Sequence, residues 1–121
     1  MNNKQDRYIF KAKFGKNWWR GYLTFYSKGF VGYFNSEEAN IDYNTVCQST
    51  GVRDKNDDLI FEGDILKIRD KTEAVVEYEA GSFKLKGELL NLNLSDFKAE
   101  ELELTGRNIH DWKQREKNIS F

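Results

Sequence analysis

Seven basic and aromatic side chains near the start of the chain have the clearest potential for chemistry. They are Lys11, Lys13, Lys16, Trp18, Trp19, Arg20 and Tyr22. Cations beside aromatic stacking surfaces hold single-stranded nucleic acids without reading their sequence. Trp, Tyr and Arg are also enriched at the energetic centres of protein interfaces. The pattern therefore predicts a partner-binding surface, and it leaves open whether the partner is a protein or a nucleic acid.

The same residues also have a purely structural interpretation. Most of the aromatic side chains can pack the core while the lysines line a solvated face. Trp18 and Trp19 distinguish the two interpretations, because neighbours in a strand point to opposite faces and one of them should lie outward. An outward Trp would anchor a protein contact, with the N-terminal lysines as its polar rim.

Alternating oxygen-bearing side chains at Asp54, Asn56 and Asp58 have the spacing with which a calcium loop begins. The rest of the loop is missing, because it would need glycine where Leu59 stands and a bidentate acid where Ile65 stands. We therefore predict a turn capped by its own side chains, and no metal site.

Catalytic groups are sparse in this sequence. Glu62, Asp64, Glu77 and Glu79 could act as acid and base only if a pocket perturbed their protonation. His110 is the sole histidine and has no serine or cysteine motif beside it, so we expect it to be solvated. The glycines are scattered rather than gathered into a phosphate-binding loop. We predict no enzymatic activity and no cofactor.

Cys47 is the only cysteine, so a disulfide within the chain is excluded and a cysteine-based zinc site lacks its other ligands. We expect it to be a small, half-buried residue of a strand. No stretch approaches the roughly 18 apolar residues of a membrane span, and the first residues contain no apolar signal region. We therefore expect no membrane association and a cytoplasmic location.

Aromatic residues make up 15% of the 121 residues, so we expect an aromatic core. The net charge is only −1, but it is unevenly distributed. Residues 1–35 carry seven Lys or Arg against one Asp, whereas residues 36–105 carry eight basic against 17 acidic side chains. Such asymmetry either marks a binding face or allows complementary charges to meet within the fold.

Alternating apolar and β-branched residues predict strands along most of the chain. The predicted strands cover residues 7–14, 18–26, 30–34, 41–49, 65–68, 74–78, 82–86 and 102–104, while residues 59–61 form a short apolar segment. Polar loops are expected at 35–40 and 54–58, and a polar tail with one or two helical turns at 108–117. Residues 88–103 fit two patterns, because alternating leucines favour a strand while residues 95–100 favour the start of a short helix.

Three segments of the chain together form a recognisable pattern. Residues 50–66, TGVRDKNDDLIFEGDIL, are preceded by Thr45, Val46 and Gln48 and contain a Thr-Gly, a charged turn and a Gly-Asp-Ile strand start. They resemble the signature of the YopX family of phage and prophage proteins. Residues 10–23 and 76–83 resemble an opening and a later hairpin of the family. The family usually has glycine where Asp57 stands and an aromatic residue where Ser49 stands, and residues 104–109 match its ending only loosely.

The resemblance implies a mainly β fold: an antiparallel meander plus an SH3-like barrel element, with little helix near the C-terminus. It also implies an origin in phages or prophages of Gram-positive bacteria and brings no assigned activity or functional residue. We predict one YopX-like domain over residues 1–121, with an N-terminal β subdomain (1–45), a barrel-like part (46–105) and a polar tail (106–121). Turn geometry explains Gly51 and Gly63 in the signature, and Asp64 can cap amides there.

These observations favour a non-enzymatic accessory protein that binds an unidentified protein partner in the bacterial host cell, for instance a defence or regulatory protein. Open sheet edges also favour self-association into a homo-oligomer. The alternative is binding of single-stranded nucleic acid through residues 11–22. The near-neutral charge and the acidic centre of the chain disfavour that alternative, because phosphate binding depends on basic contacts.

Overall fold

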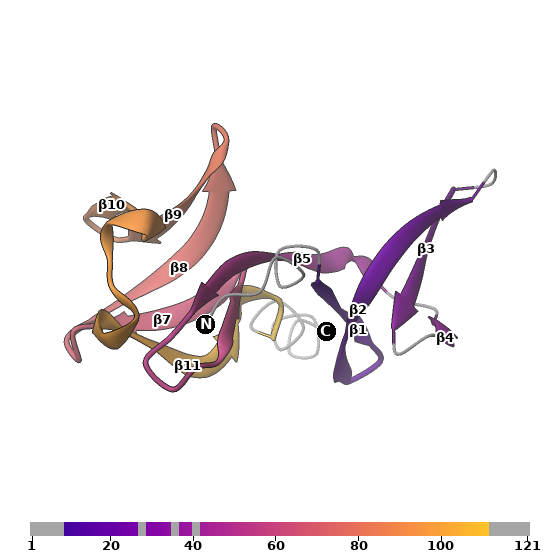
Figure 1. Cartoon of the computed structure of the whole chain (residues 1–121), viewed down its shortest axis with the longest axis horizontal. Coiled ribbons are helices and arrows are strands. Elements are labelled where there is room, and N and C mark those ends of the chain that lie inside the picture. Colours follow the sequence, from indigo (N-terminus) through magenta and orange to yellow (C-terminus); the bar gives the residue numbers. More distant parts are fainter. Residues whose placement is uncertain (1–8, 27–28, 35–36, 40–41, 112–121) are drawn as a thin grey trace, which may run out of the picture.

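The computed structural model describes residues 9–26, 29–34, 37–39 and 42–111, with the backbone alone for residue 14 and for those between 22 and 43. Two antiparallel sheets lie side by side along the long axis (Figure 1). The predicted mainly β class is confirmed. No helix in the described ranges is long and apolar enough to cross a bilayer.

The first sheet is the predicted meander, in the order β4-β3-β2-β1-β5-β6. Its strands are β1 (Phe10–Phe14), β2 (Asn17–Tyr26), β3 (Gly29–Phe34), β4 (Glu37–Ala39), β5 (Asp42–Arg53) and β6 (Leu59–Phe61). Gly15, with φ of 63°, forms the turn between β1 and β2. The prediction of a loop at 35–40 is wrong for β4, which pairs with β3 through backbone hydrogen bonds that need no apolar pattern.

The second sheet curls on itself and corresponds to the predicted barrel element (Figure 1). Its strands are β7 (Asp64–Ile68), β8 (Thr72–Glu79), β9 (Ser82–Gly87), β10 (Leu90–Asn93) and β11 (Leu102–Asn108), in the order β10-β9-β8-β7-β11. Two short 3₁₀ turns, η2 (Leu94–Asp96) and η3 (Ala99–Glu101), lead from β10 to β11. Residues 88–103 therefore contain both of the structures that their pattern allowed, a strand followed by short helical turns.

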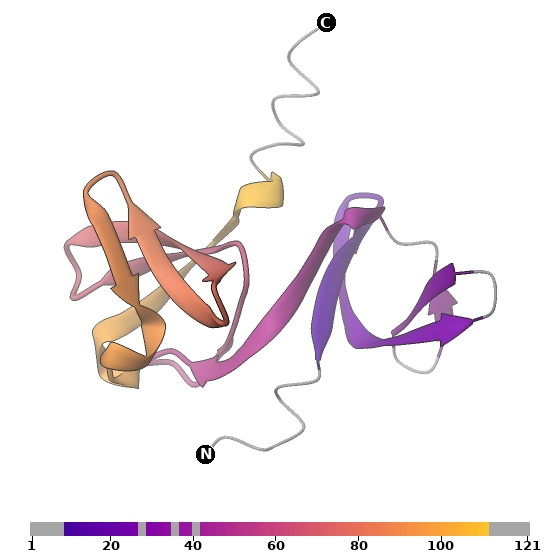
Figure 2. The same ribbon diagram turned by 90° about the horizontal axis from the view of Figure 1, so that it is seen from above.

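The long strand β5 crosses from the first sheet towards the second, as the view from above shows (Figure 2). At its end the Asp54 carboxylate accepts hydrogen bonds from the amides of Asn56 and Asp58, at 2.9 and 3.0 Å, and from Leu104 of β11 at 2.9 Å. The predicted capped turn is confirmed. Asp57, where the resemblance led us to expect glycine, adopts a left-handed φ of 65°, a conformation that Asp tolerates.

The buried core of the second sheet is aliphatic. It consists of Ile60, Leu66, Ile68, Ala74, Val76, Leu85, Leu94 and Leu102. A smaller cluster of Cys47, Leu59 and Phe61 lies between the sheets, with Ile9 and Trp18 packed against it. Among the described side chains, the expectation of an aromatic core is therefore wrong, because β-branched and leucine side chains fill the curled sheet and Phe61 is the buried aromatic residue.

Candidate functional site

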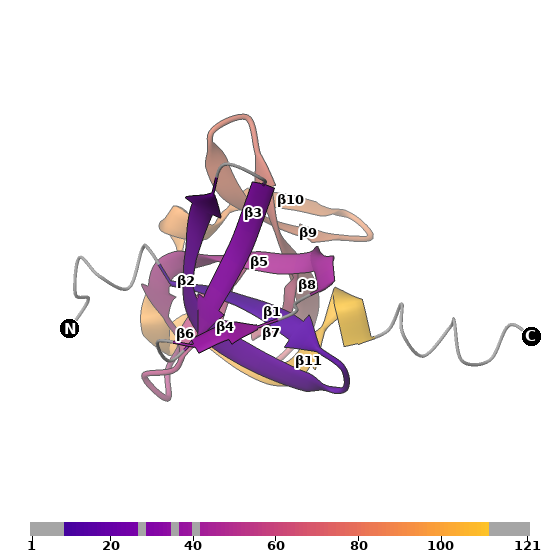
Figure 3. The ribbon, with the colours of Figure 1, turned by 90° about the vertical axis from the view of Figure 1, so that its right-hand side faces the viewer.

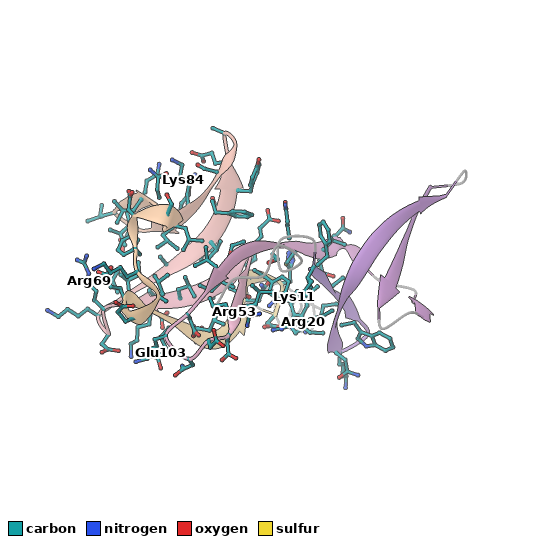
Figure 4. All side chains as sticks on the ribbon, in the orientation of Figure 1. Lys11, Arg20, Arg53, Arg69, Lys84 and Glu103 are labelled. Atoms are coloured by element: carbon teal, nitrogen blue, oxygen red, sulfur yellow. The ribbon has the colours of Figure 1, made fainter. Side chains whose placement is uncertain are left out.

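A pocket of about 410 Å³ opens where the hairpin of β1 and β2 meets β6, β7 and β11. It is lined by Lys11, Trp18, Arg20, Asp58, Leu59, Asp64, Leu104, Gly106, Arg107, Asn108 and Asp111. We call this pocket the junction groove. Lys11 and Arg20 lie between the two sheets (Figure 4), and the hairpin of β1 and β2 lies in front of β7 and β11 when the molecule is viewed along its long axis (Figure 3).

Asp64 holds the floor of the junction groove together. Asp64 is only 3% exposed. Its carboxylate accepts hydrogen bonds from Lys11 Nζ at 2.7 Å and from the Phe61 amide at 2.8 Å. It also accepts one from Asn108 Nδ2 at 3.0 Å. The predicted capping role of Asp64 is confirmed, and the ion pair with Lys11 ties the first sheet to the second. A buried pair of this kind makes loss of either partner costly.

Asn108 extends the same network at the end of β11. Its Nδ2 donates to the Glu62 carbonyl at 3.3 Å as well as to Asp64, and its Oδ1 accepts from the His110 amide at 3.0 Å. Gly63 lies against it with φ of 86°, and a Cβ there would come within 3.1 Å of the Asn108 side chain. Gly63 is therefore required both for its backbone conformation and for its lack of a side chain.

A second ion pair lies next to the groove, and its acid, Asp111, belongs to the groove lining. Lys13 is only 6% exposed, and its Nζ lies 2.8 Å from Asp111 Oδ1, which also accepts a hydrogen bond from Trp18 Nε1 at 3.1 Å. Burial raises the pKa of Asp111, but the hydrogen bond and charge of Lys13 and the hydrogen bond from Trp18 outweigh it, so the pKa lies below its usual value. Asp111 is therefore held as a carboxylate.

Trp18 is packed among charged groups. The ammonium groups of Lys11 and Lys13 lie over its ring, 4.7 and 4.8 Å from the centroid, and the His110 ring lies 6.4 Å away. Such cation–π contacts stabilise a partly desolvated cation. The expectation of a solvated lysine face is wrong for Lys11 and Lys13, because the Trp18 ring and the acids draw them into the fold. His110 is half-buried rather than solvated.

The other predicted site residues lie around this centre. Arg20 is exposed at the groove, with its guanidinium 5.0 Å from the Phe61 ring centroid, and Lys16 is exposed in the turn between β1 and β2. Trp19 is half-buried, as is Trp18, so neither has the fully outward position expected for one of them. The side chain of Tyr22 lies outside the described residues.

Asn108 and Asp111 are among the groove residues that the sequence interpretation missed. Both lie in a polar segment near the C-terminus, and their partners are more than 40 residues away along the chain. The one available signal was the charge asymmetry, which allowed complementary charges to meet within the fold. That alternative is confirmed for Lys11 and Asp64.

Cys47 is buried between the sheets, deeper than the half-buried position predicted. Burial raises the pKa of its thiol to about 12, although the Lys11 charge partly opposes this change. The thiol is therefore protonated at neutral pH, and it is a packing residue in the described fold.

A comparison of the sequence with known families matches the YopX protein family over residues 4–113. The chain belongs to the YopX family. No curated protein matches the sequence significantly. In this YopX chain the signature glycines have the backbone roles expected of them, because Gly51 and Gly63 have φ of 77° and 86°. The family signature therefore builds one wall of the junction groove.

Proposed function

We propose that this YopX-family protein is a non-enzymatic accessory protein of a phage or prophage that binds a protein partner at the junction groove. The observation that carries the proposal is the placement of Trp18 and Arg20 together at a pocket between two sheets. Trp and Arg in a partly enclosed pocket are the typical anchors of protein interfaces. Leu59 and Leu104 add apolar lining to the same pocket.

The charges of the groove fit a protein better than a polyanion. Lys11 and Lys13 are paired with Asp64 and Asp111, so their charge is largely neutralised inside the fold. Asp58 adds another acid to the lining. Binding of single-stranded nucleic acid depends on several basic contacts to phosphates, and this arrangement leaves few of them available in the groove.

The mechanism is occlusion or assembly. Arg20 can form a charge-assisted hydrogen bond with a carboxylate of the partner, while Trp18 contributes apolar contact area. A cytoplasmic protein of the bacterial host, such as a defence or regulatory protein, is the kind of target that the phage context favours.

Affinity capture from host lysate with the tagged full-length protein, with and without nuclease, tests this function. We expect the same host protein to be recovered in both conditions. Recovery of nucleic acid, with loss of all bound material after nuclease treatment, would instead support the alternative function.

A further inference from the structure

The second sheet ends at β10, and no strand in the described part of the chain lies on its outer side. Residues 89–95, LLNLNLS, contain no charge and no proline, although charged residues make up 32% of the chain. Proteins usually protect an edge strand with lysine, proline, a bulge or a covering segment. β10 is therefore an unprotected template for another strand.

The other sheet edges in the described part of the chain are protected. β4 carries two acids, Glu37 and Glu38, within its three residues. The outer side of β11 is covered by the capped turn, because the Lys55 amide donates to the Leu102 carbonyl at 2.9 Å. All three residues of β6 are buried. The contrast singles out β10.

Exposed apolar side chains lie on the same sheet. The large hydrophobic side chains that are exposed in the described structure are Leu89 (96%), Tyr78 (51%) and Leu92 (40%). Leu92 pairs across the strands with buried Leu85, so both lie on the inner face of the curled sheet. Tyr78 pairs with Phe83 on that face, with ring centroids 5.1 Å apart. Apolar side chains thus reach from β8 to the open edge.

We propose that β10 pairs in an antiparallel arrangement with β10 of a second copy of this chain, about a two-fold axis at Asn91. In an antiparallel pair, residues that lie opposite each other point to the same face of the sheet. A two-fold axis perpendicular to the sheet must therefore pass midway between the two copies of one residue. With the axis at Asn91, Leu90 lies opposite Leu92 of the second copy. The curled sheets of the two copies then join into one.

The composition of the edge favours a second copy over another partner. An uncharged strand offers no charge to select an oppositely charged segment, and it causes no like-charge repulsion when it meets itself. The Asn91 carboxamide contains both donors and an acceptor, so two of them are complementary across the axis. The edge is therefore complementary to itself.

The proposed dimer leaves the junction groove open. β10 lies at the far end of the second sheet from the hairpin of β1 and β2 (Figure 1). Each dimer would therefore present two grooves, which strengthens binding to a partner that is itself oligomeric. Pairing at β10 does not depend on the proposed function, because it uses none of the groove residues.

Sedimentation or light-scattering measurements of the full-length protein over a range of concentrations test the dimer. We expect a mass of twice 14.3 kDa for the wild type. Asn91→Glu should raise the dissociation constant of the dimer at least about tenfold, because two carboxylates would face each other across the axis. Within one chain the new acid lies opposite Lys86, so folding should be preserved, as circular dichroism would verify.

Thr72→Glu is the matched control, because it adds the same charge at an exposed position of β8 away from the edge. It should leave the dimer unchanged, and so should Arg20→Ala in the groove. A monomeric wild type at all concentrations would overturn the proposal. So would a dimer that Asn91→Glu and Thr72→Glu affect equally.

Discussion

Lys11 and Asp64 are 53 residues apart in the chain, yet their charged groups lie 2.7 Å apart at the junction of the two sheets. The pair accounts for part of the charge asymmetry, because a basic residue of the N-terminal segment neutralises an acid of the central segment. It also fixes β1 against the start of β7, and so sets the shape of the junction groove.

Lys11→Met should lower the free energy of unfolding by about 3 kcal/mol, because it leaves Asp64 buried without its cation. Lys16→Met is the control on the same hairpin. Lys16 is exposed, so this substitution should change stability by less than about 0.5 kcal/mol. Urea unfolding followed by tryptophan fluorescence measures both. Equal effects of the two substitutions would contradict a stabilising role of the pair.

Gly63→Ala should destabilise the protein more than Gly81→Ala. Both glycines have a left-handed φ, 86° and 88°, so both substitutions incur a backbone cost of about 1 kcal/mol. At Gly63 the added Cβ also meets the Asn108 side chain at 3.1 Å, whereas nothing lies within 4 Å of the Cβ position at Gly81. Thermal unfolding of the two variants would disprove this account if Gly81→Ala had the lower midpoint.

Asp111 should make the stability depend on pH in the acid range. Its folded-state pKa is below the ordinary value of 3.8, so its contribution is complete above that pH and is lost as the pH falls through the folded pKa. The stability difference between wild type and Asp111→Asn should therefore shrink as the pH is lowered from 7 to 3. A difference that stays constant over this range would show that the ionised carboxylate contributes nothing.

Cys47 should resist thiol reagents in the folded protein. It is buried, and its pKa of about 12 leaves almost no thiolate at pH 8. Because the ordinary value is 9.0, this raised pKa also means that stability should fall as the pH rises above about 9 towards 12. Labelling in native buffer should be slow and become rapid in denaturant. Rapid stoichiometric labelling of the folded protein would be inconsistent with the packing of β5.

Local patterns predicted most of the fold. Strand alternation identified both halves of the chain, and the residues of the Asp54 turn carry their own capping groups, so neither needed long-range information. The three-residue strand β4 was missed, because backbone pairing with β3 rather than a side-chain pattern defines it.

The candidate site was less predictable, because its geometry depends on contacts between distant segments. The sequence singled out Lys11, Lys13 and Trp18. The structure places Lys11 and Trp18 in the lining of the junction groove and Lys13 against the Trp18 ring. It gave no signal that Lys13 would be buried, since that depends on Asp111, which lies beyond the last strand. Asp111 reaches the hairpin of β1 and β2 because β11 of the second sheet ends beside it.

The most direct test of the proposed function compares capture of the host protein by wild type, Arg20→Ala and Lys16→Ala from nuclease-treated lysate. Both substitutions remove one exposed positive charge from the same hairpin, but only Arg20 lines the junction groove. Loss of the partner with Arg20→Ala and its retention with Lys16→Ala is the predicted result. Equal capture by all three proteins would contradict binding at the groove.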